Sequence, residues 1–127
     1  MGTFSDTERI AAADAYIDAL ATHKGDSVPF APECVRIEAG LKTGFSGDHL
    51  RRSLNRGPQF RIIAETADRK YTVVGDEVRA TLTVVTKAAV FGYRVVSYVD
   101  ETFLIPADDA KIHHIRAKLR PAVRRDP

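Results

Sequence analysis

Residues 5–25 have the hydrophobic spacing of a helix. Ser5 and Glu8 form a capping box, in which the serine side chain and the glutamate three residues later satisfy the first backbone N–H groups. Lys24 and Gly25 mark the end, because glycine tolerates the left-handed conformation of a helix cap. The pattern therefore predicts a long helix with one buried face. The residues on that face are Ile10, Ala13, Tyr16, Ile17 and Leu20.

A short alternating segment and a second helix come next in the chain. The alternation over Glu33–Ala39 predicts a strand, and Gly40–Gly47 is expected to be a loop. Ser46 is the expected N-cap of a short helix that ends at Gly57–Pro58. One face of the strand carries Val35 and Ile37, and the other carries Cys34, Arg36 and Glu38.

From Phe60 onward the hydrophobic period changes to two, which predicts antiparallel strands joined by turns. The predicted strands are Phe60–Thr66 and Lys70–Val74, joined across Ala67–Arg69, then Glu77–Ala89, Tyr93–Ile105 and Lys111–Leu119. Because the helices come first, the class is α+β. We expect a cone-like fold, with the long N-terminal helix and the short helices packed on the concave face of a curved, mainly antiparallel sheet. A cavity between the two layers is the expected ligand site.

The strand Tyr93–Ile105 differs from the others because both of its alternating faces are apolar. It nevertheless carries Asp100 near its middle. An ionised carboxylate buried without partners is costly, so we expect Asp100 to be paired, solvated in a cavity, or neutral with a raised pKa. One face holds Val95, Val99, Phe103 and Ile105, and the other holds Val96, Tyr98 and Leu104.

Composition bounds the class of protein. At 127 residues we expect one domain over 1–127, with an ordered core at about residues 6–120 and a basic tail at 121–127. The hydrophobic fraction of 44% and the charged fraction of 28% are typical of a soluble globular protein. The single cysteine and the lack of a secretory signal pattern indicate the cytoplasm. A net charge of +2 and the lack of a long apolar run lead us to expect neither nucleic acid nor membrane as a partner.

Three segments resemble ketosteroid isomerases in their order and approximate separation. They are AYIDALATHKGD on the first predicted helix, CVRIEAG on the first strand and VVSYVDETF on the long strand. Ketosteroid isomerases belong to the cone-shaped superfamily named after nuclear transport factor 2 (NTF2), together with polyketide cyclases and limonene-type epoxide hydrolases. The resemblance extends over about residues 6–120 and implies the same cone-like fold.

The resemblance also implies a site. In ketosteroid isomerases a helix tyrosine and a protonated aspartic acid on a late strand form an oxyanion hole, and a carboxylate at the end of the first strand moves the proton. Matched by motif, these catalytic roles fall on Tyr16, Asp100 and Glu38. Two alternatives stay open. Glu38 could simply pair with Arg36 on its own face, and a register shift of one residue would turn Glu101 inward in place of Asp100.

Three further side chains are candidate ligand contacts: His113, Tyr98 and His23. His113 shares a strand face with Ile115, and His23 lies seven residues after Tyr16 on the helix stripe. No His, Asp and Glu side chains have the spacing of metal ligands, so we expect neither a metal nor a cofactor.

The pattern supports three hypotheses on function. The first is an enzyme that binds a small apolar molecule (steroid-like, polyketide-like or terpenoid-like) and carries out cofactor-free proton transfer, such as isomerisation, or related lyase or hydrolase chemistry. The second is a carrier with the same pocket and no catalysis. The third is an interaction domain whose cavity is filled by side chains. We expect a homodimer through the sheet, because a convex face that is also apolar needs cover.

Overall fold

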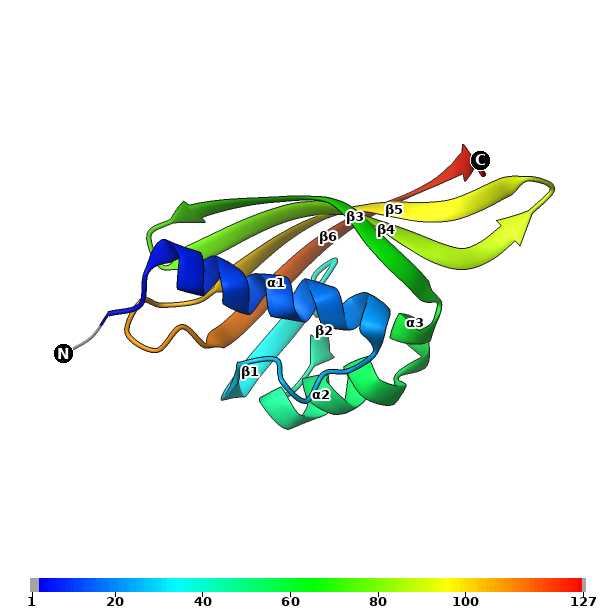
Figure 1. The fold of residues 1–127 in the computed structure, drawn as a ribbon. Coiled ribbons are helices and arrows are strands. Elements are labelled where there is room, and N and C mark those ends of the chain that lie inside the picture. The colour runs from blue at the N-terminus through cyan, green and yellow to red at the C-terminus, as the bar shows by residue number, and fades with distance from the viewer. Residues whose placement is uncertain (1–2, 127) are drawn as a thin grey trace.

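The computed structural model describes residues 3–126 and contains a curved six-stranded sheet with helices on its concave side (Figure 1). The strand order is β2-β1-β6-β5-β4-β3, antiparallel throughout except where β1 pairs with β6, and the sheet does not close. The predicted α+β class is confirmed. The helices are α1 (Asp6–Thr22), α2 (Gly47–Arg56) and α3 (Pro58–Arg61), and the strands are β1 (Phe30–Glu38), β2 (Leu41–Gly44), β3 (Ile63–Val74), β4 (Glu77–Val90), β5 (Tyr93–Leu104) and β6 (Ile112–Arg125).

Helix α1 begins with the predicted capping box. The Ser5 side chain accepts a hydrogen bond from the Glu8 amide, and the Glu8 carboxylate accepts one from the Ser5 amide. The helix ends earlier than Gly25, because His23 itself adopts the left-handed conformation, with φ of 60°. Arg9, which the sequence did not single out, is buried and donates to the backbone oxygens of Ile105 and Gly75, at 2.6 Å in both cases. These bonds tie α1 to the sheet.

Three predicted boundaries were wrong. The expected loop 40–47 contains the short strand β2. The expected pair of strands over residues 60–74 is a single strand, β3, because Asp68 takes a left-handed φ of 55° and Ala67–Lys70 forms a bulge within the strand. The expected tail continues β6 to Arg125, and Pro121 fits there because β1 no longer borders β6 at that point.

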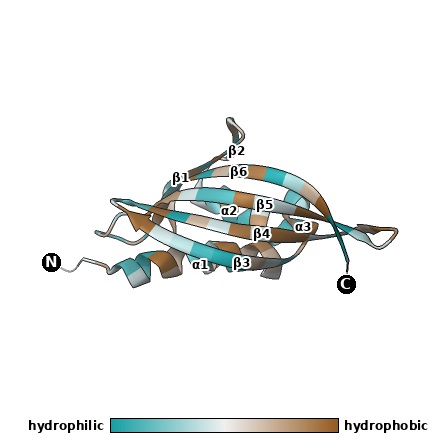
Figure 2. Ribbon diagram, turned by 90° about the horizontal axis from the view of Figure 1, so that it is seen from above, coloured by the Kyte–Doolittle hydropathy of each residue, from teal (hydrophilic) through white to brown (hydrophobic). Residues whose placement is uncertain are grey.

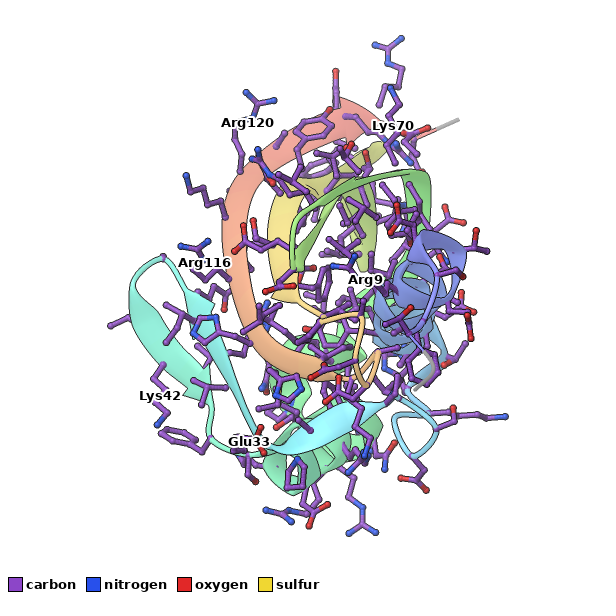
Figure 3. All side chains as sticks on the ribbon, turned by 90° about the vertical axis from the view of Figure 1, so that its left-hand side faces the viewer. Arg9, Glu33, Lys42, Lys70, Arg116 and Arg120 are labelled. Carbon is purple, nitrogen blue, oxygen red and sulfur yellow. The ribbon has the colours of Figure 1, made fainter. Side chains whose placement is uncertain are left out.

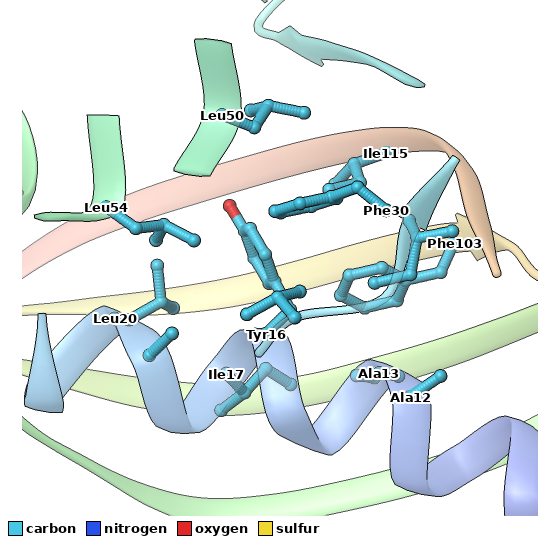
Figure 4. Packing of buried hydrophobic residues seen from close by; sticks show 14 of the residues in the cluster. Ala12, Ala13, Tyr16, Ile17, Leu20, Phe30, Leu50, Leu54, Phe103 and Ile115 are labelled. Carbon is cyan, nitrogen blue, oxygen red and sulfur yellow. The ribbon is translucent and has the colours of Figure 1, made fainter. Parts of the chain in front are cut away.

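Part of the core is a cluster of aromatic and aliphatic side chains between α1, α2 and the sheet (Figure 4). The ring of Tyr16 on α1 meets Phe103 of β5 and Phe30 of β1 edge-on, with centroids 5.6 and 6.0 Å apart. Leu50 and Leu54 of α2 close this cluster from the other side. This packing fixes the direction of the Tyr16 hydroxyl, which points away from α1.

Candidate functional site

A cavity of about 260 Å³ lies at the wide end of the cone, between α3, the end of α1 and the concave face of β4, β5 and β6. Its walls are mostly apolar, and several of the apolar residues are partly exposed, which marks the mouth. The apolar lining consists of Leu20, Phe60, Ile62, Ile63, Val84, Val95, Val96, Val99, Leu119 and Pro121, and the polar lining of Arg36, Glu38, Gln59, Thr86, Ser97 and Glu101.

Glu101 is the acid on the cavity wall. It lies on the face of β5 that carries Val99 and Phe103, and its exposed fraction is only 1%. Its Oε2 atom is buried without a hydrogen-bond partner among residues 3–126. A second cavity residue on the same strand, Ser97, also has a buried and unpartnered oxygen, Oγ. Buried polar atoms are nearly always paired, so two orphan oxygens in one cavity require an explanation.

Arg36 of β1 is the buried cation beside Glu101. Its Nε donates to the Tyr16 hydroxyl at 2.9 Å, and its Nη1 donates to Glu38 Oε2 at 3.2 Å and to Thr43 Oγ1 at 2.9 Å. The guanidinium also lies 5.7 Å from the centroid of the Phe60 ring. Side chains from four elements, α1, β1, β2 and α3, therefore contact this guanidinium and hold it at the cavity wall.

The electrostatics of the site result from this burial. Burial raises the pKa of Glu101 to about 7, against the opposing effect of Arg36, while the charges of Glu38 and Asp100 add to the rise. Burial also raises the pKa of Tyr16, so its hydroxyl stays protonated. Burial acts to lower the pKa of Arg36, but Tyr16, Glu101 and Glu38 outweigh it and raise that pKa. The cavity thus combines a fixed cation with a carboxyl group that exchanges its proton near neutral pH.

The predicted position of Asp100 was wrong. Its side chain lies on the convex face, is 43% exposed and pairs with Arg79 at 3.5 Å. The register alternative is the one observed, because the face of β5 that packs against α1 is the face of Val99, Phe103 and Glu101.

Tyr16 and Glu38 lie near the site in different ways. Tyr16 is fully buried, as predicted, but it does not line the cavity, and its hydroxyl contacts Arg36. Glu38 does line the cavity, and it also forms the ion pair with Arg36 that the sequence offered as the alternative. Tyr16 and Glu38 are thus brought together by Arg36.

The three predicted ligand contacts lie outside the cavity lining. His23 is within 3.2 Å of the Ile63 carbonyl, behind the cavity wall. Tyr98 is 41% exposed on the convex face, where the Arg120 guanidinium lies 5.2 Å from its ring centroid. His113 lies between Glu33 and Asp109, at 2.8 and 2.7 Å. His23 is the C-cap of α1, Tyr98 is on the face of β5 opposite Glu101, and His113 is at the start of β6, so none of the three faces the cavity.

The convex face is polar where the sequence predicted a need for apolar cover. Arg116 and Arg120 point away from the helices on the outer side of β6 (Figure 3), and Arg79, Asp100 and Lys118 share the groove beside them. The reason for expecting a sheet-to-sheet dimer therefore does not hold for the described part of the chain. Pairing itself stays a prediction.

Comparison with known proteins places the chain in a family. A family model described as "Domain of unknown function (DUF8021)" matches residues 4–119. The chain belongs to the DUF8021 family. No curated protein matches the sequence of this DUF8021 chain.

Solved structures show that the DUF8021 chain has the NTF2-like fold, as the resemblance implied. An LEH-like epoxide hydrolase of M. tuberculosis is 22% identical, with a TM-score of 0.70 over 90% of this chain and 84% of the other. An NTF2-like protein of unknown function from Cytophaga hutchinsonii is 9% identical, with a TM-score of 0.70 over 91% and 98%. A phenazine biosynthesis-related protein from Pseudomonas aeruginosa is 14% identical, with a TM-score of 0.64 over 94% and 83%. At these identities the likeness concerns the fold.

Sequence reasoning missed Glu101 and Arg36 as the charged centre of the cavity. The sequence contained only part of the signal for both, because it did not show which face of each strand meets the helices. Glu101 alternates in step with Val99 and Phe103 and so lies on their face of the strand. Arg36 lies in the same way on the face of Cys34, which is fully buried. Within residues 3–126 no group of three His, Cys, Asp or Glu side chains could hold a metal ion, and no helix is long and apolar enough to cross a membrane.

Proposed function

We propose that this DUF8021 protein binds a small, mainly apolar molecule in the concave cavity, with a polar group of that molecule against Glu101 and Arg36. The observation that carries the proposal is the buried Glu101 carboxyl, whose Oε2 lacks a partner on the wall of an otherwise apolar cavity. A ligand oxygen at that point would satisfy Oε2 and offset its loss of solvent.

The second orphan oxygen narrows the class of ligand. Ser97 and Glu101 are four residues apart on one strand face, which separates their Cα atoms by about 13 Å at the rise of a β-strand. Both line the same cavity. A ligand that is elongated, apolar in the middle and polar at each end fits this spacing. Steroid-like and terpenoid-like molecules with two oxygen functions belong to this class.

We further propose cofactor-free acid–base chemistry in the cavity. Glu101 in its neutral form donates a hydrogen bond to a ligand carbonyl oxygen, which stabilises negative charge that develops there. Glu38, which forms an ion pair with Arg36, is the base that takes a proton from the carbon next to the carbonyl and returns it elsewhere, as in the isomerisation of a double bond. Tyr16 acts as a positioning residue, because its hydroxyl fixes Arg36.

A carrier without catalysis is the second candidate. The observation in its favour is that Arg36 already donates to Glu38 at 3.2 Å, so the only other carboxylate on the described cavity wall is engaged in an ion pair. The two candidates share the binding site and differ only in whether the bound molecule is converted.

The test uses 2-naphthol as the binding probe and a β,γ-unsaturated cyclic ketone as the reaction probe. Naphthol fluorescence at pH 8, above the Glu101 pKa of about 7, should show binding to the wild-type protein. Glu101→Gln should weaken this binding by about tenfold, because the hydrogen bond from the naphthol hydroxyl to the ionised carboxylate is lost. Asp100→Asn is the matched control, since it removes a carboxylate on the next residue outside the cavity. Equal binding by all three proteins would refute the site.

Absorbance of the conjugated ketone separates the enzyme from the carrier. Turnover that is lost in both Glu101→Gln and Glu38→Gln and kept in Asp100→Asn supports the acid–base roles. Binding of naphthol that depends on Glu101, without turnover of the ketone, supports the carrier. Circular dichroism of each variant checks that the fold is intact.

A further inference from the structure

The hairpin between β4 and β5 extends beyond the helices, and its tip is apolar (Figures 1 and 2). Phe91 at the tip has 96% of its surface exposed, Val90 has 65% and Tyr93 has 46%. Large side chains at this level of exposure contribute almost nothing to the core. Their presence needs an explanation outside the packing of the described chain.

The backbone of the tip makes Phe91 more unusual. Phe91 and Gly92 both have left-handed conformations, with φ of 52° and 79°. The two-residue turn that joins β4 to β5 favours Asn, Asp or Gly at such positions, and a bulky residue there is strained. Neither the turn nor the core accounts for a phenylalanine at this position, so its exposed ring is the feature to explain.

The apolar surface continues from the tip toward the cavity. Val95 and Val123 are partners in the β5–β6 register and are both exposed, at 39% and 65%. Leu119 and Ile62 come next, at 43% and 46%, and both line the cavity mouth. A single apolar strip therefore leads from Phe91 to the entrance of the ligand site.

Positive charge surrounds the tip. Lys87, Arg124 and Arg125 are exposed, and the Arg125 guanidinium lies 6.0 Å from the centroid of the Tyr93 ring. Arg94 pairs with Asp126 at 2.8 Å, so that acid is already neutralised. Two copies that met through this hairpin would bring these cations against their own counterparts. The charge therefore favours an anionic partner over a second copy.

We propose that the β4–β5 hairpin docks on the surface of a membrane that contains anionic lipids. Phe91, Val90 and Tyr93 enter the boundary between headgroups and acyl chains, and Lys87, Arg124 and Arg125 lie at the level of the lipid phosphates. This docking needs no spanning segment, and it departs from the expectation of no membrane partner. Passage of a ligand from the bilayer along the apolar strip rests on the proposed function, whereas the docking itself does not.

Co-sedimentation of the full chain with vesicles tests the proposal. The wild-type protein should bind phosphatidylcholine vesicles that contain phosphatidylserine, should bind pure phosphatidylcholine weakly, and should dissociate as salt rises. Phe91→Asn should lower the bound fraction by about tenfold, because the largest apolar side chain of the tip is removed. Asparagine suits the left-handed turn, so this variant should unfold at the same or a higher urea concentration than wild type.

Matched variants elsewhere complete the test. Leu41→Asn removes an exposed apolar side chain from the β1–β2 hairpin and should leave vesicle binding unchanged. Arg124→Glu with Arg125→Glu should abolish the preference for anionic vesicles, whereas Arg79→Glu with Arg116→Glu on the convex face should keep it. Absence of vesicle binding by wild type, or equal binding by Phe91→Asn, would overturn the proposal. So would light scattering that shows a dimer which Phe91→Asn converts to a monomer.

Discussion

Asp100 and Glu101 are neighbours on β5 and carry the same chemical group on opposite faces of the sheet. Asp100, on the convex face, is partly exposed and is paired with Arg79. Glu101, on the concave face, is almost fully buried, and its Oε2 has no partner in the described chain. The comparison shows that the outer surface accommodates the Asp100 carboxyl with a cation beside it and solvent access, so its cost is small. On the inner surface the same group lowers the free energy of unfolding at neutral pH, so its presence there calls for a function.

The largest effect is expected from aromatic residues on the two faces. Phe103→Ala should lower the free energy of unfolding by about 3–5 kcal/mol, because the side chain is fully buried against Tyr16. Tyr98→Ala on the convex face should cost about 1 kcal/mol or less, since only a partly exposed contact with Arg120 is lost. Urea denaturation measures both. Similar costs would mean that the two faces do not differ in packing as described.

The pH dependence of stability should separate the two acids. The folded pKa of Glu101 is raised from 4.5 to about 7, so the folded protein keeps a proton that the unfolded chain has released. The contribution of Glu101 to the free energy of unfolding is therefore complete below pH 4.5 and is lost as pH rises through about 7. The loss amounts to about 3 kcal/mol. Glu101→Gln should flatten this slope and should be more stable than wild type above about pH 7.

Asp100→Asn is the control for that measurement. Its partly exposed carboxylate pairs only across the surface, so removing it should change stability by a few tenths of a kcal/mol. Loss of its charge removes only the last and smallest cause of the raised Glu101 pKa, so most of the slope should remain. If Asp100→Asn removed the pH dependence of the free energy of unfolding and Glu101→Gln did not, the assignment of the two faces would be reversed. Urea midpoints across the pH range give the answer directly.

The smallest effect concerns His113, far from the cavity. Burial lowers its pKa, but hydrogen bonds to Asp109 and Glu33 outweigh burial and raise it. Its contribution to stability is therefore complete below the ordinary value of 6.5 and is lost as pH rises through the raised folded value. His113→Gln should cost about 1 kcal/mol or less at low pH, and the difference from wild type should shrink at high pH.

His114→Gln is the control for His113, because His114 forms no ion pair within residues 3–126 and lies on the other strand face. Thermal unfolding at several pH values measures both variants. An effect of His113→Gln that did not depend on pH would indicate lost packing in place of lost charge.

The sequence predicted the fold well where local signals agree. The capping box at Ser5, the N-cap at Ser46 and the strand patterns of β4 and β5 depend on neighbouring residues only, and each was confirmed. The bulge at Asp68 could not be predicted, because a bulge and a turn use the same residue types. Long-range packing decided between them.

The site was predicted less well than the fold. Glu38 was placed on the right element, and Arg36 was noticed only as its neighbour. Asp100 was chosen over Glu101 because both faces of β5 are apolar in sequence, so periodicity alone could not tell which face meets the helix. Glu101 and Phe103 lie on the same face of β5, but this becomes informative only once the helix is known to cover that face.

The parallel pairing of β1 with β6 has a consequence for how the chain folds. Phe30 pairs with Ile112, and Glu38 pairs with Ala117. The longer ladder of β1 therefore cannot form until β6, the last strand of the chain, is present. Until then β1 pairs only with the short strand β2, and a two-stranded ladder is marginal in water. We therefore expect slow folding that is limited by this late closure and a strong sensitivity to truncation within β6.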